Sequence, residues 1–296
     1  MTLRLARGRR PHFRNQLLGS FAPAVLILLP LLWSLGLVAS FTAIFWGITD
    51  LSTGASFDLS FSSLTTLGFV TAPTRLSRTL ASGEALMGLA IVALMISFLP
   101  TLYTSFSRRE IAVGRLTTRA GAPPSPIDFL SRLSAIGQLD HIGDRWMEWE
   151  DWFVELGETH TTFPALIYFR SSSPDRSWLT AAEVALDTAA IVTAAELTEH
   201  TGQADTMMRS GYLALRSIAD YYRIEPESDT APLSIGREDV EALLDQIETV
   251  GLVVGPDRES VWLTFAGWRR NYDQAVAGLR ELVGDLPSHW IPDDDS

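Results

Sequence analysis

The segment Ser62-Ser63-Leu64-Thr65-Thr66-Leu67-Gly68-Phe69-Val70 is a short polar stretch between two long apolar runs. Residues 21–48 precede it and residues 83–106 follow it, and both runs lack Lys, Arg and Asp. A membrane-spanning helix needs about 20 apolar residues, so each run is long enough to cross a bilayer. The sequence therefore predicts an all-α membrane protein in which this segment lies between two spans.

Composition predicts one soluble domain in addition to the two spans. The 296 residues have a mean hydropathy of +0.15 and contain no Cys, which excludes disulfide frameworks and Cys-based metal or redox sites. Residues 1–109 carry 9 Arg against 3 acidic residues, whereas residues 110–296 carry 14 Arg against 32 acidic residues. The second part is therefore expected to be soluble, and its acidity argues against nucleic-acid binding.

Arginines flank the two predicted spans and set their orientation. Five precede the first span in the basic N-terminus, residues 1–20, and four follow the second: Arg4, Arg7, Arg9, Arg10 and Arg14, then Arg108, Arg109, Arg115 and Arg119. Basic flanks stay in the cytoplasm, so both termini are expected there. A signal peptide cleaved near Val38-Ala39-Ser40 is the alternative, but its apolar core would be unusually long.

The residues before the polar segment predict a short helix. Ser56 can cap a helix over residues 56–65, whose C-terminal end would direct its partial negative charge toward the membrane centre. A dehydrated cation would be stabilised there. Non-helical backbone at membrane depth is tolerated where it lines a water path, so the following residues can form a re-entrant segment.

The run Thr-Thr-x-Gly-aromatic resembles the TVGYG-type selectivity filter of potassium channels, in which backbone carbonyls replace the hydration shell of the ion. On this resemblance Thr66, Leu67, Gly68, Phe69 and Val70 occupy the five filter positions after Thr65, and potassium ions are expected at residues 66–69. Gly68 would adopt a positive φ. Phe69 would pack outward against the predicted pore helix.

Val70 departs from the family pattern, which has a second glycine at this position. A β-branched residue disfavours the left-handed conformation, so the outermost ion site is in question. A non-selective or sodium-permeable pore is therefore an alternative to a potassium-selective one. The resemblance covers residues 21–106 and implies a homotetramer in the plasma membrane, the inner membrane of bacteria, which conducts K⁺ or other monovalent cations without a resident cofactor.

The second span carries small and weakly polar residues at three- and four-residue spacing, so that they share one helical face: Ala90, Ala93, Ser97, Thr101 and Thr104. This face either lines an inner cavity or allows helices to pack closely. Gly88 and Pro100 are candidate bending points, and Pro100 resembles the bend near the intracellular gate of some tetrameric channels.

After the second span, residues 107–126 are expected to extend the inner helix and end in a Pro-rich linker. A cytoplasmic helical bundle follows over residues 127–286, and an acidic tail over 287–296. Apolar residues at heptad-like spacing predict either core or a seam between subunits: Ile142, Trp146, Trp149, Phe153 and Leu156. Further helices are predicted from a capping box at Thr180 toward His200 with Gly202 as the stop, then over 207–223, 238–250 and 259–283.

The stretch from His160 to Ser171 and the following Ser177-Trp178 resemble a cytoplasmic region of bacterial two-span ion-channel proteins, for which the resemblance implies no chemistry. Arg170 lies among aromatic residues and needs a carboxylate, and Asp187 is the predicted partner. A ligand-binding role for Arg170 is the alternative.

Signals of an enzyme are absent from the sequence, which has no phosphate-binding glycine loop, dinucleotide fingerprint or His pair at metal-ligand spacing. We therefore expect a tetrameric cation channel, potassium-conducting, that is gated by its cytoplasmic helical domain. Two alternatives stay open: a non-selective or sodium-permeable channel, and a non-conducting membrane scaffold that binds a protein partner.

Overall fold

The computed structural model describes residues 11–171, 176–199, 201–225 and 231–285, and all regular elements in these ranges are helices. The all-α prediction is therefore confirmed for this part of the chain. Residues 1–10 of the basic N-terminus and the acidic tail 287–296 lie outside it. The chain divides into two compact units, residues 17–104 (the span unit) and residues 105–296 with 1–16 (the helical unit).

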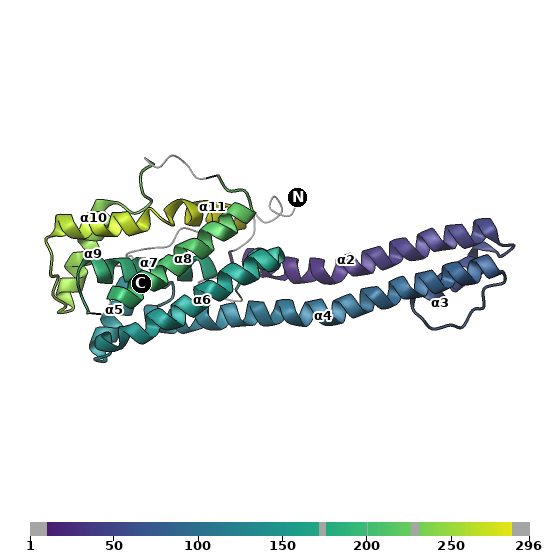
Figure 1. The fold of residues 1–296 in the computed structure, drawn as a ribbon, viewed down its shortest axis with the longest axis horizontal. Helices are drawn as coiled ribbons and strands as arrows, with labels where there is room; N and C mark the ends of the chain where they lie inside the picture. The colour runs from purple at the N-terminus through teal and green to yellow at the C-terminus, as the bar shows by residue number, and fades with distance from the viewer. Residues whose placement is uncertain (1–10, 172–175, 200, 226–230, 286–296) are drawn as a thin grey trace. The chain divides into compact units, whose positions relative to one another are not determined.

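The span unit contains α2 (Pro11–Ile48) from residue 17 on, α3 (Thr53–Leu64) and α4 (Arg75–Ala120) up to residue 104. An 18-residue window within residues 24–48 of α2 and another within α4 each have a mean hydropathy of 2.3, so both helices are long and apolar enough to cross a membrane. Figure 1 shows α2 and α4 running antiparallel, with the short helix α3 at the end where α2 stops and α4 begins.

Two helix starts in the span unit are defined by caps. The helix after the polar segment begins at Arg75, eight residues before the span predicted over 83–106, and Thr74 and Ser77 cap each other reciprocally: each backbone N–H donates to the other's hydroxyl, at 3.0 and 3.1 Å. The helix α3 begins at Thr53 and is capped by Ser52, whose hydroxyl accepts from the Ala55 N–H. Ser56 is buried within α3 instead of capping it.

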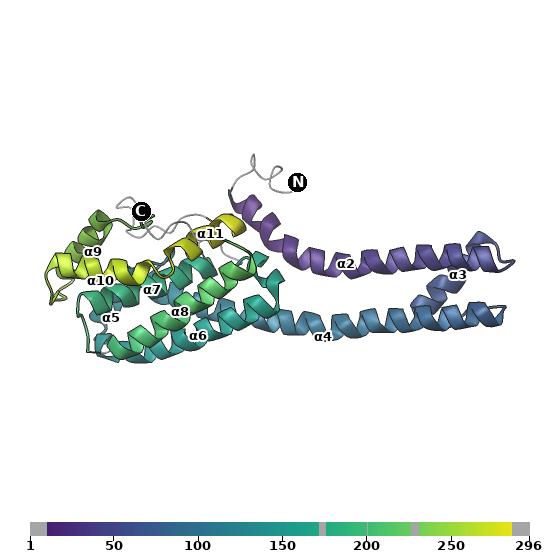
Figure 2. The ribbon, with the colours of Figure 1, turned by 45° about the horizontal axis from the view of Figure 1, so that its top comes forward.

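The helical unit consists of α5 (Pro126–Ala135), α6 (Ile142–Thr162), α7 (Trp178–Ala194), α8 (Thr201–Tyr221), α9 (Arg237–Thr249), α10 (Arg258–Arg269) and α11 (Asp273–Val283), with short 3₁₀ turns at Leu139–His141 and Pro164–Tyr168. Figure 2 shows these helices gathered into one bundle. Residues 105–120 of α4 belong to the same unit, where Val113, Leu116 and Ala120 are buried in its core.

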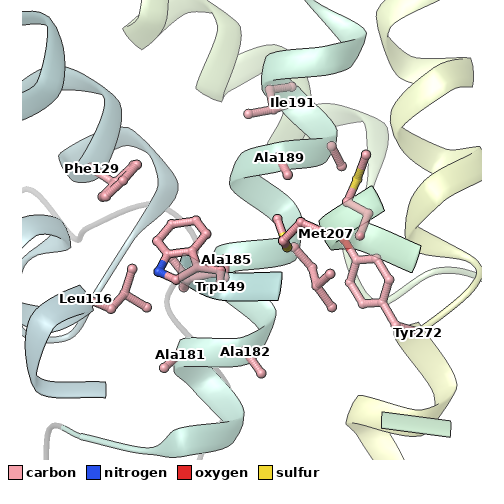
Figure 3. Packing of buried hydrophobic residues seen from close by; sticks show 14 of the residues in the cluster. Leu116, Phe129, Trp149, Ala181, Ala182, Ala185, Ala189, Ile191, Met207 and Tyr272 are labelled. Carbon is pink, nitrogen blue, oxygen red and sulfur yellow. The ribbon is translucent and has the colours of Figure 1, made fainter. Parts of the chain in front are cut away.

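The helix α7 is the central element of the bundle, since all its residues except Thr193 are buried. Its many alanines allow neighbouring helices to approach closely. In Figure 3, Ala181, Ala185 and Ala189 lie along α7 between Trp149 on one side and Met207 and Tyr272 on the other. A helix buried on all sides is expected to be mostly apolar, and Glu183 and Asp187 are the charged exceptions in α7.

The aromatic stripe of α6 serves as core. Ile142, Trp146, Trp149, Phe153 and Leu156 are all buried within a single chain. Packing inside the bundle therefore accounts for the heptad-like spacing, and a seam between subunits is not needed to bury it.

Several helix ends in the bundle were predicted wrongly. Ser177, not Thr180, caps α7, and its hydroxyl accepts from the N–H groups of Leu179 and Thr180. The helix ends at Ala194, and Gly202 lies in the first turn of α8 instead of stopping α7. The helix predicted over 259–283 is divided into α10 and α11, because a turn at residues 270–272 brings Tyr272 into the core.

Candidate functional site

Ser62 in α3 organises the backbone of the candidate filter segment, residues 65–70. Its carbonyl accepts from the N–H groups of Leu67 at 3.0 Å and Gly68 at 3.4 Å. Its hydroxyl accepts from the Val70 N–H at 3.3 Å. The side chain is almost fully buried, at 1 % exposure, so these contacts are shielded from solvent. Ser62 was part of the quoted stretch, but its residue type alone gave no sign of this role.

The direction of these N–H groups fixes the direction of three carbonyls. In a trans peptide the carbonyl of one residue points opposite to the N–H of the next. Because the N–H groups of Leu67, Gly68 and Val70 face Ser62, the carbonyls of residues 66, 67 and 69 point away from α3. The oxygens of these three peptides are therefore not used by Ser62.

Two residues in this segment, Thr66 and Gly68, have a positive φ, and Leu67 lies between them. Gly68 has φ 70°, as the sequence predicts, and Thr66 has φ 56°. The left-handed conformation is uncommon for a non-glycine residue and costs of order 1–3 kcal/mol, so Thr66 is held there by its surroundings. A Cβ atom at position 68 would meet nothing within 4 Å, so the need for glycine at this position comes from φ alone.

Phe69 and Val70 differ in burial. Phe69, predicted to pack outward against the pore helix, is 60 % exposed in the single chain. Val70 instead packs on the apolar cluster of Phe45, Leu59 and Ala72. Its φ is not positive, in keeping with its β-branched side chain. Thr65 is the C-cap of α3, and its hydroxyl donates to the Phe61 carbonyl at 2.6 Å.

The small-residue face of α4 is exposed within the chain: Ala90, Ala93, Ser97, Thr101 and Thr104. The hydroxyls of Ser97, Thr101 and Thr104 donate to carbonyls of their own helix at 2.8–3.1 Å. Pro100 lies inside α4 and is exposed too. The sequence allows two interpretations of this face, the lining of an inner cavity or a surface for close helix packing. Because it is exposed, it does not serve to pack helices of one chain against each other.

Arg109, on the part of α4 that belongs to the helical unit, is enclosed by the stretch that begins at His160. Its guanidinium donates to the carbonyls of Leu166 at 3.0 Å and Phe169 at 2.5 Å, and it contacts His160 Nε2 at 3.2 Å. Glu110 is its ion-pair partner at 3.0 Å. Arg109 is only 3 % exposed, so these contacts are stronger than they would be in water.

His160 is a neutral, fully satisfied core residue. Its Nδ1 lies 3.0 Å from the Leu156 carbonyl and must donate, so Nε2 is the acceptor for Arg109. Burial and the charge of Arg109 lower the pKa of His160 to about 3. Its ring also contacts that of Trp178 at a tilt of 39°, with the centroids 4.9 Å apart.

The predicted pair between Arg170 and Asp187 is replaced in the structure by another. Both oxygens of Asp187 accept from Arg269 Nη1, at 2.7 and 2.6 Å. Arg170 donates to the carbonyls of Val283 and Gly284 at the end of α11, where the partial charge of a helix favours a cation. Sequence proximity suggested Asp187 as the partner of Arg170. The partner of Asp187 is instead Arg269, which lies 82 residues farther along the chain.

Arg269 is the centre of a buried cluster of charges. Besides Asp187 it binds Glu183 and Asp273, each at 2.7 Å, and its own side chain has 0 % exposure. Tyr272 donates to Asp187 at 2.6 Å, and Arg280 binds the second oxygen of Glu183 at 2.5 Å. Burial raises the pKa of Asp187, against the opposing effect of the Arg269 charge.

No protein-family model matches this sequence, and no curated protein or solved structure is significantly similar to it.

Proposed function

We propose that the chain is one subunit of a tetrameric cation channel in which residues 65–70 form the ion-selective part of the pore. The observation that supports this best is the arrangement around Ser62. It holds three N–H groups on one side, so the carbonyls of Thr66, Leu67 and Phe69 point to the other. Carbonyl oxygens in such a row can replace the hydration shell of a cation.

The surroundings of this segment agree with that use. It follows a short helix and lies between two helices that are each apolar enough to span a bilayer. Leu67 and Phe69 are exposed in the single chain, although they are large and apolar. Assembly of four chains around one axis would cover such residues and would bring four rows of carbonyls together.

Gating through the helical unit is supported by Arg109. The helix α4 is continuous from Arg75 to Ala120, and Arg109 on it is bound by the backbone of residues 166 and 169. A movement of these loop residues would act directly on α4. Its exposed small-residue face around Ser97 and Thr101 would then line the inner cavity, with Pro100 as the bending point.

The test is cation flux from liposomes loaded with K⁺ or Na⁺, measured for the purified protein and for Gly68→Ala. Alanine at φ 70° is strained although there is space for its Cβ, so the variant should fold and lose flux. Gly54→Ala is the matched control, since Gly54 has open space around it and lies in a helix with ordinary φ. Cross-linking in the same liposomes should give a tetramer.

A non-selective or sodium-permeable pore is the second candidate, and Val70 favours it. Because its φ is not positive and its side chain packs inward, the outer end of the row differs from that of a filter with a second glycine. Equal K⁺ and Na⁺ flux, lost in Gly68→Ala, would support this candidate. Absence of flux from folded tetramers, together with copurification of a fixed protein partner, would support the scaffold and contradict both channels.

A further inference from the structure

Glu84 is a carboxyl group buried in the interior of the span unit. It lies on α4 with 0 % exposure, and its Oε1 is 2.5 Å from the hydroxyl of Ser60 on α3. The same hydroxyl is 3.1 Å from the Val38 carbonyl on α2. The contact Glu84–Ser60–Val38 therefore joins all three helices of the span unit.

The number of protons available to these two hydrogen bonds differs between ionised and protonated Glu84. A hydroxyl has one proton to donate. If Glu84 is ionised, Ser60 must divide its proton between two acceptors, Glu84 and Val38. If Glu84 is protonated, it donates to Ser60, and Ser60 donates to Val38. Only the neutral acid gives each of the two contacts a proton of its own.

The charges around Glu84 also favour the neutral form. Among the described residues none forms an ion pair with it. Residues 24–48 of α2 carry no charge, Asp58 on α3 and Arg75 on α4 are exposed, and Arg78 donates to the Ala72 carbonyl. An unpaired carboxylate in an apolar interior costs several kcal/mol, and such a group normally takes up a proton instead.

Further polar atoms surround this contact. The second oxygen of Glu84, the hydroxyl of Ser56 one turn before Ser60, and that of Thr42 one turn after Val38 are buried, and no described residue bonds to them. Buried polar atoms usually bind water, which would give Glu84 a partner for proton exchange.

We propose that Glu84 is a proton-binding site: in its protonated form it leaves the Ser60 proton to the Val38 carbonyl and so joins α3 to α2, and on ionisation it takes that proton and loosens α3 from α2. Ser60 lies two residues before Ser62, the residue that orients the candidate filter segment. Release of α3 would therefore disturb the carbonyl row. The effect on conduction rests on the proposed function, whereas the proton site itself does not.

The direct test is infrared spectroscopy of the full-length protein in lipid vesicles, titrated from neutral to alkaline pH. We expect a carbonyl band of a protonated carboxyl at neutral pH that is lost on alkaline titration, is absent in Glu84→Gln and is kept in Asp58→Asn. Ser60→Ala should shift this band, because it removes the hydrogen-bond acceptor of the acid. If the wild-type and Glu84→Gln spectra are the same at neutral pH, Glu84 is ionised and the proposal is wrong.

Flux measured over the same pH range separates this proposal from the proposed function. In a conducting wild-type protein, flux should change as the band disappears, and the flux of Glu84→Gln should be independent of pH. If the flux stays constant while the infrared band disappears, the proposed effect of Glu84 on conduction is wrong. If the wild type conducts under no condition, only the channel function is contradicted, and the infrared titration still decides the proton site.

Discussion

Gly88 of α4 lies directly against the backbone of Leu64, the last residue of α3. A Cβ atom built at position 88 would come 1.9 Å from the Leu64 carbonyl oxygen and 2.9 Å from its carbonyl carbon. These are backbone atoms, so they cannot turn away as a side chain would. The sequence suggested Gly88 as a bending point, but its position shows that it allows α3 and α4 to touch.

Gly88→Ala should therefore separate α3 from α4. Overpacking costs about 1–3 kcal/mol, or more where backbone must move, and this exceeds the gain of about 1 kcal/mol that alanine brings to a helix. Gly83→Ala is the control in the same helix, since nothing lies within 4 Å of its Cβ position. Thermal unfolding in detergent should show a lower midpoint for Gly88→Ala only. Equal midpoints in the two variants would contradict the close contact.

Ser62→Ala should disturb the candidate filter segment without unfolding α3. The substitution leaves the Val70 N–H without its acceptor, which costs about 1–3 kcal/mol for a buried group, and frees the outer end of the segment. Ser63→Ala is the matched control, because the Ser63 hydroxyl only donates to the Leu59 carbonyl of its own helix. The ratio of K⁺ to Na⁺ flux should change in Ser62→Ala alone. A change of the same size in Ser63→Ala would contradict the role of Ser62.

The two apolar helices of the span unit could be predicted from sequence because their signals are local. Hydropathy marks α2 and α4, and Gly68 marks a turn with positive φ. The contacts that hold the unit together are not local. Ser62 as the acceptor for three N–H groups, and Gly88 as the place where α3 touches α4, depend on how segments meet in space.

The charged residues of the helical unit illustrate the same limit. Arg109 belongs to the arginines from which a cytoplasmic flank is predicted, and nothing in the neighbouring sequence indicates that its side chain is buried. Arg269 follows Trp268 at the end of an ordinary amphipathic helix, yet it binds three carboxylates. Pairing over 82 or more residues cannot be deduced from spacing, so Asp187 was assigned to the wrong arginine.

Acid should destabilise the helical unit through His160. Its pKa is lowered to about 3 in the folded protein, below the usual value of 6.5, so the unfolded chain takes up the proton first. The stabilisation is complete above pH 6.5 and falls by up to about 1.4 kcal/mol per pH unit as the pH drops toward 3.

The measurement is the free energy of unfolding against pH, followed by Trp fluorescence in the full-length protein. His160→Gln should have a lower free energy of unfolding than the wild type at neutral pH. Below pH 6.5 its free energy of unfolding should fall less steeply than that of the wild type. His141→Gln is the control, because His141 is exposed. The same acid slope in wild type and His160→Gln would show that His160 does not stay neutral in the fold.

Arg269→Met should be among the most destabilising substitutions in the bundle. Removing the guanidinium leaves Glu183, Asp187 and Asp273 buried together, and breaking a buried ion pair from one side costs about 3–5 kcal/mol. Arg270→Met is the matched control at the next position, and as an exposed substitution it should change stability by no more than about 0.5 kcal/mol.

A double-mutant cycle tests which arginine Asp187 binds. Asp187→Asn combined with Arg269→Met should be clearly non-additive, because each single variant leaves the other charge unpaired, and couplings of about 0.5–3 kcal/mol are typical of such contacts. Asp187→Asn combined with Arg170→Met should be additive, since Arg170 binds the carbonyls at the end of α11 instead. Chemical unfolding of the full-length protein measures both cycles. Coupling to Arg170 alone would restore the pair predicted from sequence, whereas coupling to Arg269 alone ties α7 to α10 through the bidentate contact at Asp187.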